Sequence, residues 1–447
     1  NIMATYISRT PGSAGNRKKF TISMWVKRVK LGVDQWMIQA GASGSEFDIR
    51  FTTSDQIRFS TWDGSNGYGM ITTRVFRDTA AWYHLVFQYD SAQATDTNRN
   101  KIYVNGTQID PSDTSAYNAG KHPPQNYDNP SWNNTAEFRI NDVTWTSSSA
   151  KEAIYTHIHH TDGYAYPAST FGETDSTSGI WKPKTSPSVT YGSNGFFLKF
   201  ENSGNLDLDS SGNNLTFATS GTLTQNVDSP TNNFAILNRL YYTTESGTLD
   251  FGNRNFTKSS SVNRSCFSTL APSAGKWYCE VKVANDTDCK LGIVDLSADY
   301  NGLNAQAVDF SDSGSGYSYN EAGTKSVAGN SSSYATAYNA NDIIGIAMDL
   351  DNNKLYFSLN GTWQNSGVPT SGSTGTGAIG INAGSAYAFA GKVNGGTDLG
   401  FNFGSGDYST SATVASSNAD DNGIGSFEYD VPAGYYALCT KNIKEFG

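Results

Sequence analysis

The sequence predicts an all-β fold, with two antiparallel β-sandwich domains of jelly-roll-like form in tandem. Aromatic residues make up 13% of the 447 residues and charged residues only 16%, while glycine occurs 45 times. This composition disfavours helices, because glycine, β-branched and aromatic residues replace the residues that helices prefer. Apolar and polar residues alternate in short runs, and no apolar stripe of period 3.6 persists for three turns. The length fits two sandwiches of roughly 200 residues each.

Strand-like runs occur throughout the first half of the chain. Residues 20–27, 47–51 and 57–62 alternate apolar and polar side chains with period two, which predicts half-buried strands. Further runs of this kind lie at residues 82–89, 101–104 and 196–200. The run at 101–104 ends in Asn105-Gly106, a pair typical of a two-residue hairpin turn.

The second half repeats this pattern. Its strand-like runs lie at residues 276–283, 343–348 and 354–359, and the last is followed by Asn360-Gly361. Between the halves lies a polar stretch rich in Thr, Ser and Gly, which by its composition indicates a linker. We therefore predict a first sandwich over residues 1–217, a linker over 218–235 and a second sandwich over 236–447.

Charge argues against nucleic acid as a partner. The net charge is −10, and nine of the ten excess negative charges follow residue 227, where they would repel a phosphate backbone. The basic clusters at residues 17–19 and 27–30 adjoin or alternate with apolar positions, as on the solvated side of strands. No run of about 18 apolar residues occurs, so membrane insertion is not expected.

All four cysteines, at positions 266, 279, 289 and 439, lie in the second half. They form no Cys-x-x-Cys pair of the kind that binds zinc. Cys279 and Cys289 flank a predicted turn at residues 284–288 and could face each other across a hairpin. The alternative is free buried thiols, because spacing alone does not fix disulfide geometry.

Several motifs resemble known families. The segments TISMWVK at 21–27, WYHLV at 82–86 and IYVNG at 102–106 resemble the laminin-G-like branch of the concanavalin A-like lectin/glucanase superfamily. The segments GKWYCEV at 275–281, NDIIGIAMD at 341–349 and LYFSLNGTW at 355–363 are similar to a SPRY domain. Four segments resemble predicted tail-fibre and appendage proteins of bacteriophages: FGETD at 171–175, GIWKPK at 179–184, DSPTNN at 228–233 and GYYALCTKN at 434–442.

Because this superfamily includes glucanases, a glycan hydrolase must be considered. The resemblance implies a strand motif Glu-x-Asp-x-Glu, in which the first carboxylate is the nucleophile and the last the acid/base. The chain has Glu46-Phe47-Asp48-Ile49-Arg50, and an arginine cannot deliver a proton near neutral pH. No Gly-x-Ser-x-Gly nucleophile motif occurs either. We therefore predict no catalytic residues and no enzymatic activity.

Two patterns raise the question of a metal. His157 and His159 share one face of a strand and could bind a metal together, but without an evident third ligand a surface strand is the simpler interpretation. The laminin-G-like resemblance implies calcium, held by loop oxygens. The candidate ligands are Asp96, Asn98, Asp128 and Asn133, with Asn129 and Asn134 beside them. No cofactor is required, since such loops also form through Asx-turns.

The remaining signal is a set of aromatic residues in polar loops, where no core is expected to hold them. An aromatic ring can stack on the apolar face of a sugar while neighbouring Asn and Asp side chains bond its hydroxyls, and many protein-binding loops share this composition. The candidate glycan-binding residues are Trp62, Asp63, Asn66, Tyr68, Tyr127, Trp132, Tyr317 and Tyr319.

We consider three hypotheses. The resemblances imply, first, a non-enzymatic virion appendage, a tail fibre or spike component whose loops bind a host-surface glycan or protein. Its partners would be other virion proteins, its location the particle surface, and its state a homo-oligomer, for which the fibre resemblance implies a trimer. In the second hypothesis the chain is a structural capsid or tail decoration protein, with its aromatic loops buried against neighbouring subunits. The third, a glycan hydrolase, requires a second carboxylate near Glu46.

Overall fold

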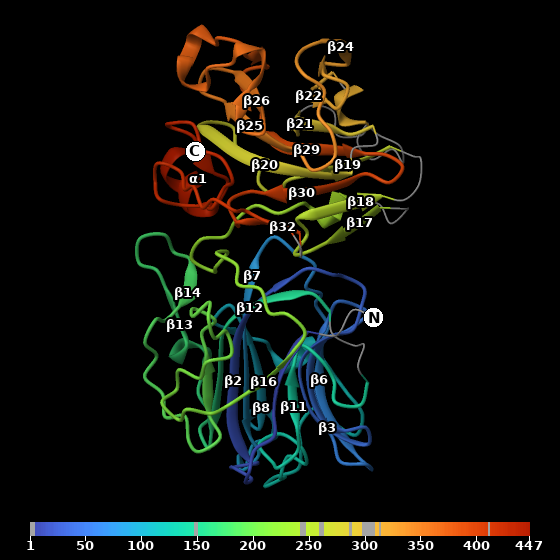
Figure 1. The fold of residues 1–447 in the computed structure, drawn as a ribbon. Helices are drawn as coiled ribbons and strands as arrows, with labels where there is room; N and C mark the ends of the chain where they lie inside the picture. Colours follow the sequence, from blue (N-terminus) through green and yellow to red (C-terminus); the bar gives the residue numbers. More distant parts are fainter. Residues whose placement is uncertain are drawn as a thin grey trace. The chain divides into compact units, whose positions relative to one another are not determined.

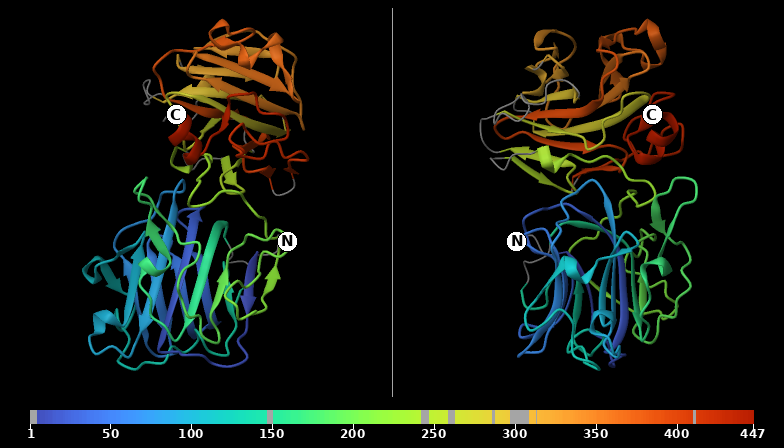
Figure 2. Two further views of the ribbon diagram at one scale, coloured as in Figure 1. Left: turned by 90° about the vertical axis from the view of Figure 1, so that its left-hand side faces the viewer. Right: turned by 180° about the vertical axis from the view of Figure 1, so that it is seen from behind.

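The computed structural model of this chain describes residues 5–146, 151–241, 247–258, 263–285, 288–296, 309–312, 314–409 and 412–447. The chain divides into two compact units, Asn1–Gln225 and Asn226–Gly447 (Figure 1). The predicted all-β class is confirmed, since each unit consists of sheets whose strands pair almost entirely antiparallel, with β20 and β33 as a parallel pair (Figure 2). Within the described ranges the α-helical structure is one short helix, α1 (Thr440–Phe446). No helix there is long and apolar enough to cross a membrane.

The first unit contains an eight-stranded sheet with the order β10-β6-β5-β4-β3-β11-β1-β16. Its strands are β1 (Tyr6–Arg9), β3 (Gln35–Ala42), β4 (Ser45–Phe51), β5 (Ile57–Trp62), β6 (Gly67–Thr72), β10 (Thr114–Ala116), β11 (Phe138–Ile140) and β16 (Ala218–Ser220). The last strand lies inside the stretch expected as linker. It pairs with β1, so the first unit extends beyond residue 217.

The second sheet of this unit has six strands in the order β15-β12-β2-β7-β8-β9. They are β2 (Lys19–Arg28), β7 (Trp82–Asp90), β8 (Asn100–Val104), β9 (Thr107–Gln108), β12 (Ala153–Asp162) and β15 (Phe196–Leu198). Asn105 and Gly106 join β8 to β9 with φ of 48° and 85°. Both values are positive, as a type I′ turn requires, so the predicted hairpin is confirmed.

The two sheets enclose a core of alternating apolar side chains, such as Phe20 and Ile22 from β2 and Phe47 and Ile49 from β4. The prediction of half-buried strands is incomplete for β2, because Thr21 on its other face is also buried. The cause is the chain from 163 to 195, here called the covering segment, which lies over that face. Two examples of its contacts are Thr21 Oγ1, which donates to the Tyr164 carbonyl, and Phe171, which packs on Val86.

The covering segment has its own short elements: η3 (Ala168–Thr170), β13 (Gly172–Thr174) and β14 (Trp181–Pro183). Two further 3₁₀ turns of the first unit are η1 (Asp96–Asn98) and η2 (Pro111–Asp113).

The second unit also has two large sheets. The nine-stranded sheet comprises β17 (Gly247–Asp250), β18 (Asn255–Lys258), β30 (Asp398–Asn402), β20 (Lys276–Asn285), β25 (Ile343–Asp349), β26 (Lys354–Leu359) and β27 (Thr362–Trp363), with β28 (Ile379–Gly380) on β26 and β33 (Tyr436–Ala437) on β20. The six-stranded sheet comprises β19 (Arg264–Phe267), β29 (Tyr387–Val393), β21 (Lys290–Asp295), β22 (Gly316–Asn320), β23 (Thr324–Val327) and β24 (Asn330–Ser333). A small pair is formed by β31 (Asp407–Ser409) and β32 (Ala412–Thr413), and the 3₁₀ turns are η4 (Arg239–Tyr241), η6 (Phe310–Asp312), η7 (Gln364–Ser366) and η8 (Pro369–Thr374).

The C-terminal part of the second unit contacts the nine-stranded sheet through a buried carboxylate. Glu280 on β20 is fully buried and accepts four hydrogen bonds, from the hydroxyls of Tyr278 and Tyr408 and from the backbone amides of Glu428 and Tyr429. Phe427 packs edge-on against the Tyr278 ring in a second apolar cluster. This carboxylate therefore ties the C-terminal chain to the sheet.

The hairpin that could have brought Cys279 and Cys289 face to face is absent. Cys279 lies in β20 and Cys289 directly precedes β21, and these strands belong to different sheets. These two strands therefore do not pair as a hairpin, and residues 286–287 of the predicted turn lie outside the described residues. All four cysteines are buried thiols outside any disulfide, which confirms the alternative interpretation.

Candidate functional site

Five of the eight predicted glycan-binding residues gather at the tip of the β5–β6 hairpin, and we call them the hairpin-tip site: Trp62, Asp63, Asn66, Tyr68 and Tyr127. Four belong to the hairpin itself. The fifth, Tyr127, arrives from the loop between β10 and β11, and its hydroxyl donates to Asp63 Oδ2 at 3.0 Å. The rings of Tyr68 and Tyr127 meet edge to face, with 5.3 Å between their centroids.

Asp63 is held rigidly at this tip. Its Oδ1 accepts hydrogen bonds from the backbone amides of Ser65 at 2.9 Å and Asn66 at 2.8 Å, and its Oδ2 accepts the Tyr127 hydroxyl. The hydrogen bond from the Asn66 backbone amide is the main cause of a pKa of Asp63 below its usual value. The exposed tip therefore presents an ionised carboxylate in a fixed orientation.

Strand pairing places the tryptophan on the other face of the hairpin from the tyrosines. Trp62 pairs with Glu46 and Gly67, whereas Tyr68 pairs with Thr61, and neighbouring pairs point to opposite faces of a sheet. The Trp62 ring is half-buried and packs over Gly67, where a Cβ would lie 2.8 Å from a ring carbon. Glycine at position 67 thus makes room for the ring.

The sheet face beside Trp62 carries residues that the sequence did not single out. Arg58 lies over the half-buried Tyr117 ring, 3.7 Å from its centroid, and Asn118 Oδ1 accepts from the Gly67 amide at 3.3 Å. Arg58 also pairs with Asp48 at 2.8 Å. The sequence could have indicated Arg58, because the alternating run 57–62 places it on the outward face of the strand. It could not have indicated Tyr117, because Tyr117 lies in a loop whose position depends on the fold.

The residues of the glucanase motif form an ion-pair network. Asp48 is fully buried and bonded to Arg58 Nη2 at 2.8 Å and Ser60 Oγ at 2.6 Å. Arg50 lies over the Trp36 ring, 4.0 Å from its centroid. Burial, and secondly the Asp48 charge, raise the pKa of Glu46. A carboxylate near Glu46 does exist, but a buried and ion-paired Asp48 cannot flank a glycosidic bond as a retaining pair must.

Three predicted glycan-binding residues are core residues. The expectation that they lie in loops outside the core is therefore wrong. Trp132 is 1% exposed and packs against Phe47 and His160 between the sheets. Tyr317 and Tyr319 are buried in β22, where both point into the core of the second unit. The cause in β22 is strand alternation, because residues two apart share a face.

The candidate calcium ligands are divided between the turn η1 and the loop that joins β10 to β11. Asp96 and Asn98 form the exposed turn η1, while the exposed Asp128 is 3.7 Å from Arg17. Asn133 is buried, and its amide is bonded to Asp162 and to Asn194. Asn129 is also buried, and Asn134 donates to the Pro130 carbonyl. No group of three or more His, Cys, Asp or Glu able to hold a metal occurs among the residues the structure describes.

The histidine run does not lie on a surface strand, because His159 and His160 are buried and His157 is partly buried. The register of β12 shifts between Thr156 and His159, and His157 has a positive φ of 49°. His159 is stacked on Phe197, and its Nδ1 is 2.9 Å from the Tyr191 hydroxyl of the covering segment. The covering segment accounts for this burial, which sequence spacing could not show.

A second buried histidine, His84, also contacts the covering segment. Trp181 Nε1 donates to His84 Nδ1 at 2.9 Å, so the proton of the neutral ring lies on Nε2, 2.9 Å from Ser23 Oγ. Burial lowers the pKa of His84 to about 3 and that of His160 to about 4, and it holds the pKa of His159 well below 6.5. These rings are therefore neutral at physiological pH.

Comparison with known proteins identifies two domains. Residues 4–152 match the family model of the concanavalin A-like lectin/glucanases superfamily, in its laminin-G type, and residues 276–380 match that of the SPRY domain. No curated protein matches the chain. None of these matches bears on the resemblance to phage tail fibres.

Solved SPRY domains are among the similar structures. The SPRY domain of human HERC1 is 11% identical, with a TM-score of 0.27, over 35% of this chain and 91% of that chain. The PSpry domain of TRIM65 is 12% identical, with a TM-score of 0.30, over 37% of this chain and 88% of that chain. Scores this low carry no functional argument. From the family models, the chain carries a concanavalin A-like domain within residues 4–152 followed by a SPRY domain within residues 276–380.

Proposed function

We propose that the protein is a non-enzymatic binding module whose first unit binds a glycan at the hairpin-tip site. The observation that carries this proposal is the partly exposed Trp62 ring, one residue before Asp63, whose carboxylate is held in place by three hydrogen bonds. Both matched domain types are compatible with a binding module, and the ion-paired Asp48 favours binding over hydrolysis.

The roles of the five residues follow from their contacts. Trp62 offers an apolar ring face on which a sugar ring can stack. The exposed Asn66 side chain and the remaining lone pairs of Asp63 can bond sugar hydroxyls. Tyr127 fixes Asp63, and Tyr68 packs against Tyr127, so these two tyrosines position the carboxylate. A site held rigid before binding loses less entropy when the ligand arrives.

A glycan array probed with the purified chain tests whether this function exists. We expect binding to a restricted set of glycans, and weaker signals for the same glycans with Asn66→Ala. Ser54→Ala is a suitable surface control, since Ser54 is exposed on a turn of the same unit. An array on which the folded wild-type chain gives no signal would contradict glycan binding and would favour a protein ligand or a structural role.

We further infer that the chain is part of a virion appendage, displayed on the particle surface and assembled as a homo-oligomer, with a trimer as the expected state. The support is the resemblance of segments 171–175, 179–184, 228–233 and 434–442 to tail-fibre proteins. Mass spectrometry of purified particles should detect the chain, and native mass spectrometry should show three copies. Protection of Trp62 from oxidative labelling in the particle would indicate the decoration role instead.

A further inference from the structure

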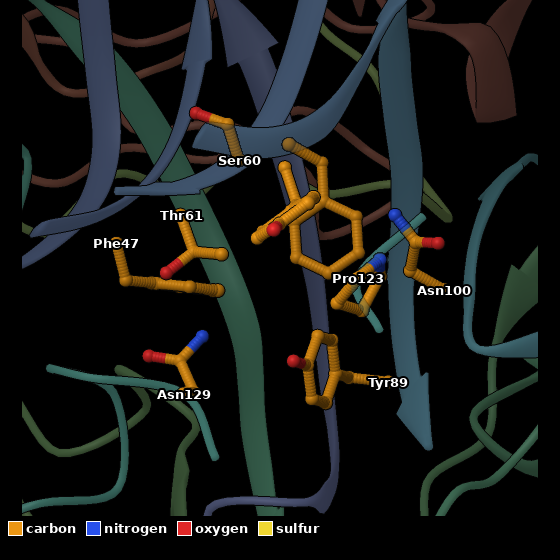
Figure 3. A pocket seen from close by; sticks show the side chains of 9 residues that line it. Phe47, Ser60, Thr61, Tyr89, Asn100, Pro123 and Asn129 are labelled. Atoms are coloured by element: carbon orange, nitrogen blue, oxygen red, sulfur yellow. The ribbon is translucent and has the colours of Figure 1, made fainter. Parts of the chain in front are cut away.

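A small cavity lies beneath the hairpin-tip site, inside the first unit. It has a volume of about 10 Å³, and its lining includes Phe47, Phe59, Tyr68, Tyr89 and Asn129 (Figure 3). One water molecule requires about 10–15 Å³ on this measure, so a larger ligand does not fit. The lining comes from β4, β5, β6, β7, β8 and the loop that carries Tyr127.

Two buried polar atoms of this lining have no hydrogen-bond partner among the described residues: Tyr89 Oη and Asn129 Nδ2. Tyr89 is 3% exposed and Asn129 is 0% exposed. In Figure 3 the Tyr89 hydroxyl points toward the side of the cavity on which Asn129 lies. Buried polar groups without a partner are rare in folded proteins and indicate a missing partner such as a bound water.

The orientation of both groups is fixed by their other contacts. Asn129 Oδ1 accepts from the backbone amides of Ser131 at 3.1 Å and Trp132 at 2.8 Å. This amide therefore cannot flip, because Nδ2 cannot accept those bonds. The Tyr89 ring is stacked on Phe20, with 4.7 Å between centroids and 10° between planes. Neither group can turn away to find a partner elsewhere without breaking these contacts.

We propose that the cavity is a binding site for a single water molecule that bridges Tyr89 Oη and Asn129 Nδ2. The water accepts a hydrogen bond from the Asn129 amide and exchanges one with the Tyr89 hydroxyl. Thr61, which also lines the cavity, donates its hydroxyl to the Glu46 carbonyl at 3.2 Å, so its oxygen can accept from the water. A buried water with three such partners is typical of folded proteins.

This water ties the strand β7 to the loop that holds the hairpin-tip site. Asn129 lies two residues after Tyr127, whose hydroxyl positions Asp63. The bridge therefore keeps the Tyr127 loop on the sandwich. Its importance for ligand binding rests on the proposed function, whereas the water site itself does not.

High-resolution crystal structures of the wild type, Tyr89→Phe and the control Tyr103→Phe test the proposal. Tyr103 lies on the adjacent strand β8, and its hydroxyl has its own partner, Gln88 Oε1 at 3.3 Å. We expect one water within hydrogen-bond reach of Tyr89 Oη and Asn129 Nδ2 in the wild type and in Tyr103→Phe. In Tyr89→Phe we expect that water to be lost or poorly occupied.

Magnetic relaxation dispersion in solution should show one fewer long-lived internal water in Tyr89→Phe, and amide exchange at Ser131 should be faster. An empty cavity in the wild type, or a direct bond between Tyr89 and Asn129, would overturn the proposal. If Tyr89→Phe does not fold, the wild-type density decides alone. Neither readout involves a glycan, so failure here is distinct from failure of the proposed function.

Discussion

The two units show that one composition signal can have two structural causes. In the first unit, Trp62 and Tyr68 flank an exposed hairpin tip with a fixed carboxylate. In the second unit, Tyr317 and Tyr319 have the same Ser, Gly and Asn neighbours, yet both are buried in β22. The difference is the tyrosine spacing: two residues apart around a serine is a strand pattern with one buried face. An aromatic residue between polar neighbours is therefore evidence for a surface only where this alternation is absent.

The largest expected effect is a difference in stability between variants of two tryptophans of the first unit. Trp132→Ala should lower the free energy of unfolding by about 3–5 kcal/mol, because it empties a core position. Trp62→Ala should lower it by less than about 1.5 kcal/mol, because that ring is only partly buried. Urea unfolding of both variants measures the difference. Equal losses would contradict the assignment of one ring to the core and the other to a surface.

The next effect concerns the second unit. Glu280→Gln should lower its free energy of unfolding by about 2–3 kcal/mol, since an amide places a donor against buried donors that the carboxylate accepts. Amide hydrogen exchange should become faster in residues 418–446 and stay unchanged in the core of the first unit. The exposed Glu445→Gln, in the same C-terminal region, is the control. Uniform acceleration over both units would refute the view that Glu280 acts as a local tie.

Acid should act oppositely on buried groups of the two units. The pKa of His84 is about 3 and that of His160 about 4, below the unfolded value of about 6.5, so the unfolded chain binds more protons. First-unit stability is therefore lost as pH falls below about 6.5, by about 1.4 kcal/mol per pH unit for each such histidine. Burial raises the pKa of Glu280, so its contribution to stability grows as pH falls toward that pKa.

Amide hydrogen exchange in each unit at about pH 7 and about pH 5 checks the predicted direction of each stability change. In His84→Gln the glutamine Oε1 can still accept the hydrogen bond from Trp181. This variant should lose one histidine's share of the pH dependence of first-unit stability. The covering segment should open first on acidification, because a protonated His84 cannot accept the Trp181 hydrogen bond. A first unit that is equally stable at both pH values would exclude buried neutral histidines.

The smallest expected effect is at the tip itself. Tyr127→Phe removes the hydroxyl that fixes Asp63 and should cost about 1 kcal/mol or less, since the bond is exposed. The pKa of Asp63 should rise, because one of its hydrogen bonds is lost, and NMR titration of its carboxyl measures this. Tyr164→Phe, an exposed tyrosine of the covering segment, is the control. An unchanged pKa of Asp63 would show that Tyr127 does not position it.

Much of the fold was predictable from alternation and turn residues. The strands at 57–62 and 354–359 and the turn at Asn105-Gly106 appear where their local patterns place them. The burial of Thr21 and His159 was not predictable, because a distant part of the chain, the covering segment, creates it. Local sequence reports one face of a strand well and says little about what covers the other.

The candidate site was predictable in part for the same reason. Trp62, Asp63, Asn66 and Tyr68 lie in one hairpin, so their proximity follows from local pairing. Tyr127 reaches the site through a long loop, and its bond to Asp63 needed the fold. Trp132 lies in a similar Asn-rich loop but turns inward, because Asn129 caps the backbone that directs it to the core.

The most direct test of the account is a calorimetric titration of the strongest array glycan into three proteins: the wild type, Trp62→Ala and Trp145→Ala. Trp145 is a matched control, because it is a partly exposed tryptophan of the same unit that packs on Trp36, near the other end of β4. We predict that Trp62→Ala weakens binding at least about tenfold, or about 1.4 kcal/mol, and that Trp145→Ala binds like the wild type. Unchanged affinity in a folded Trp62→Ala would contradict the hairpin-tip site.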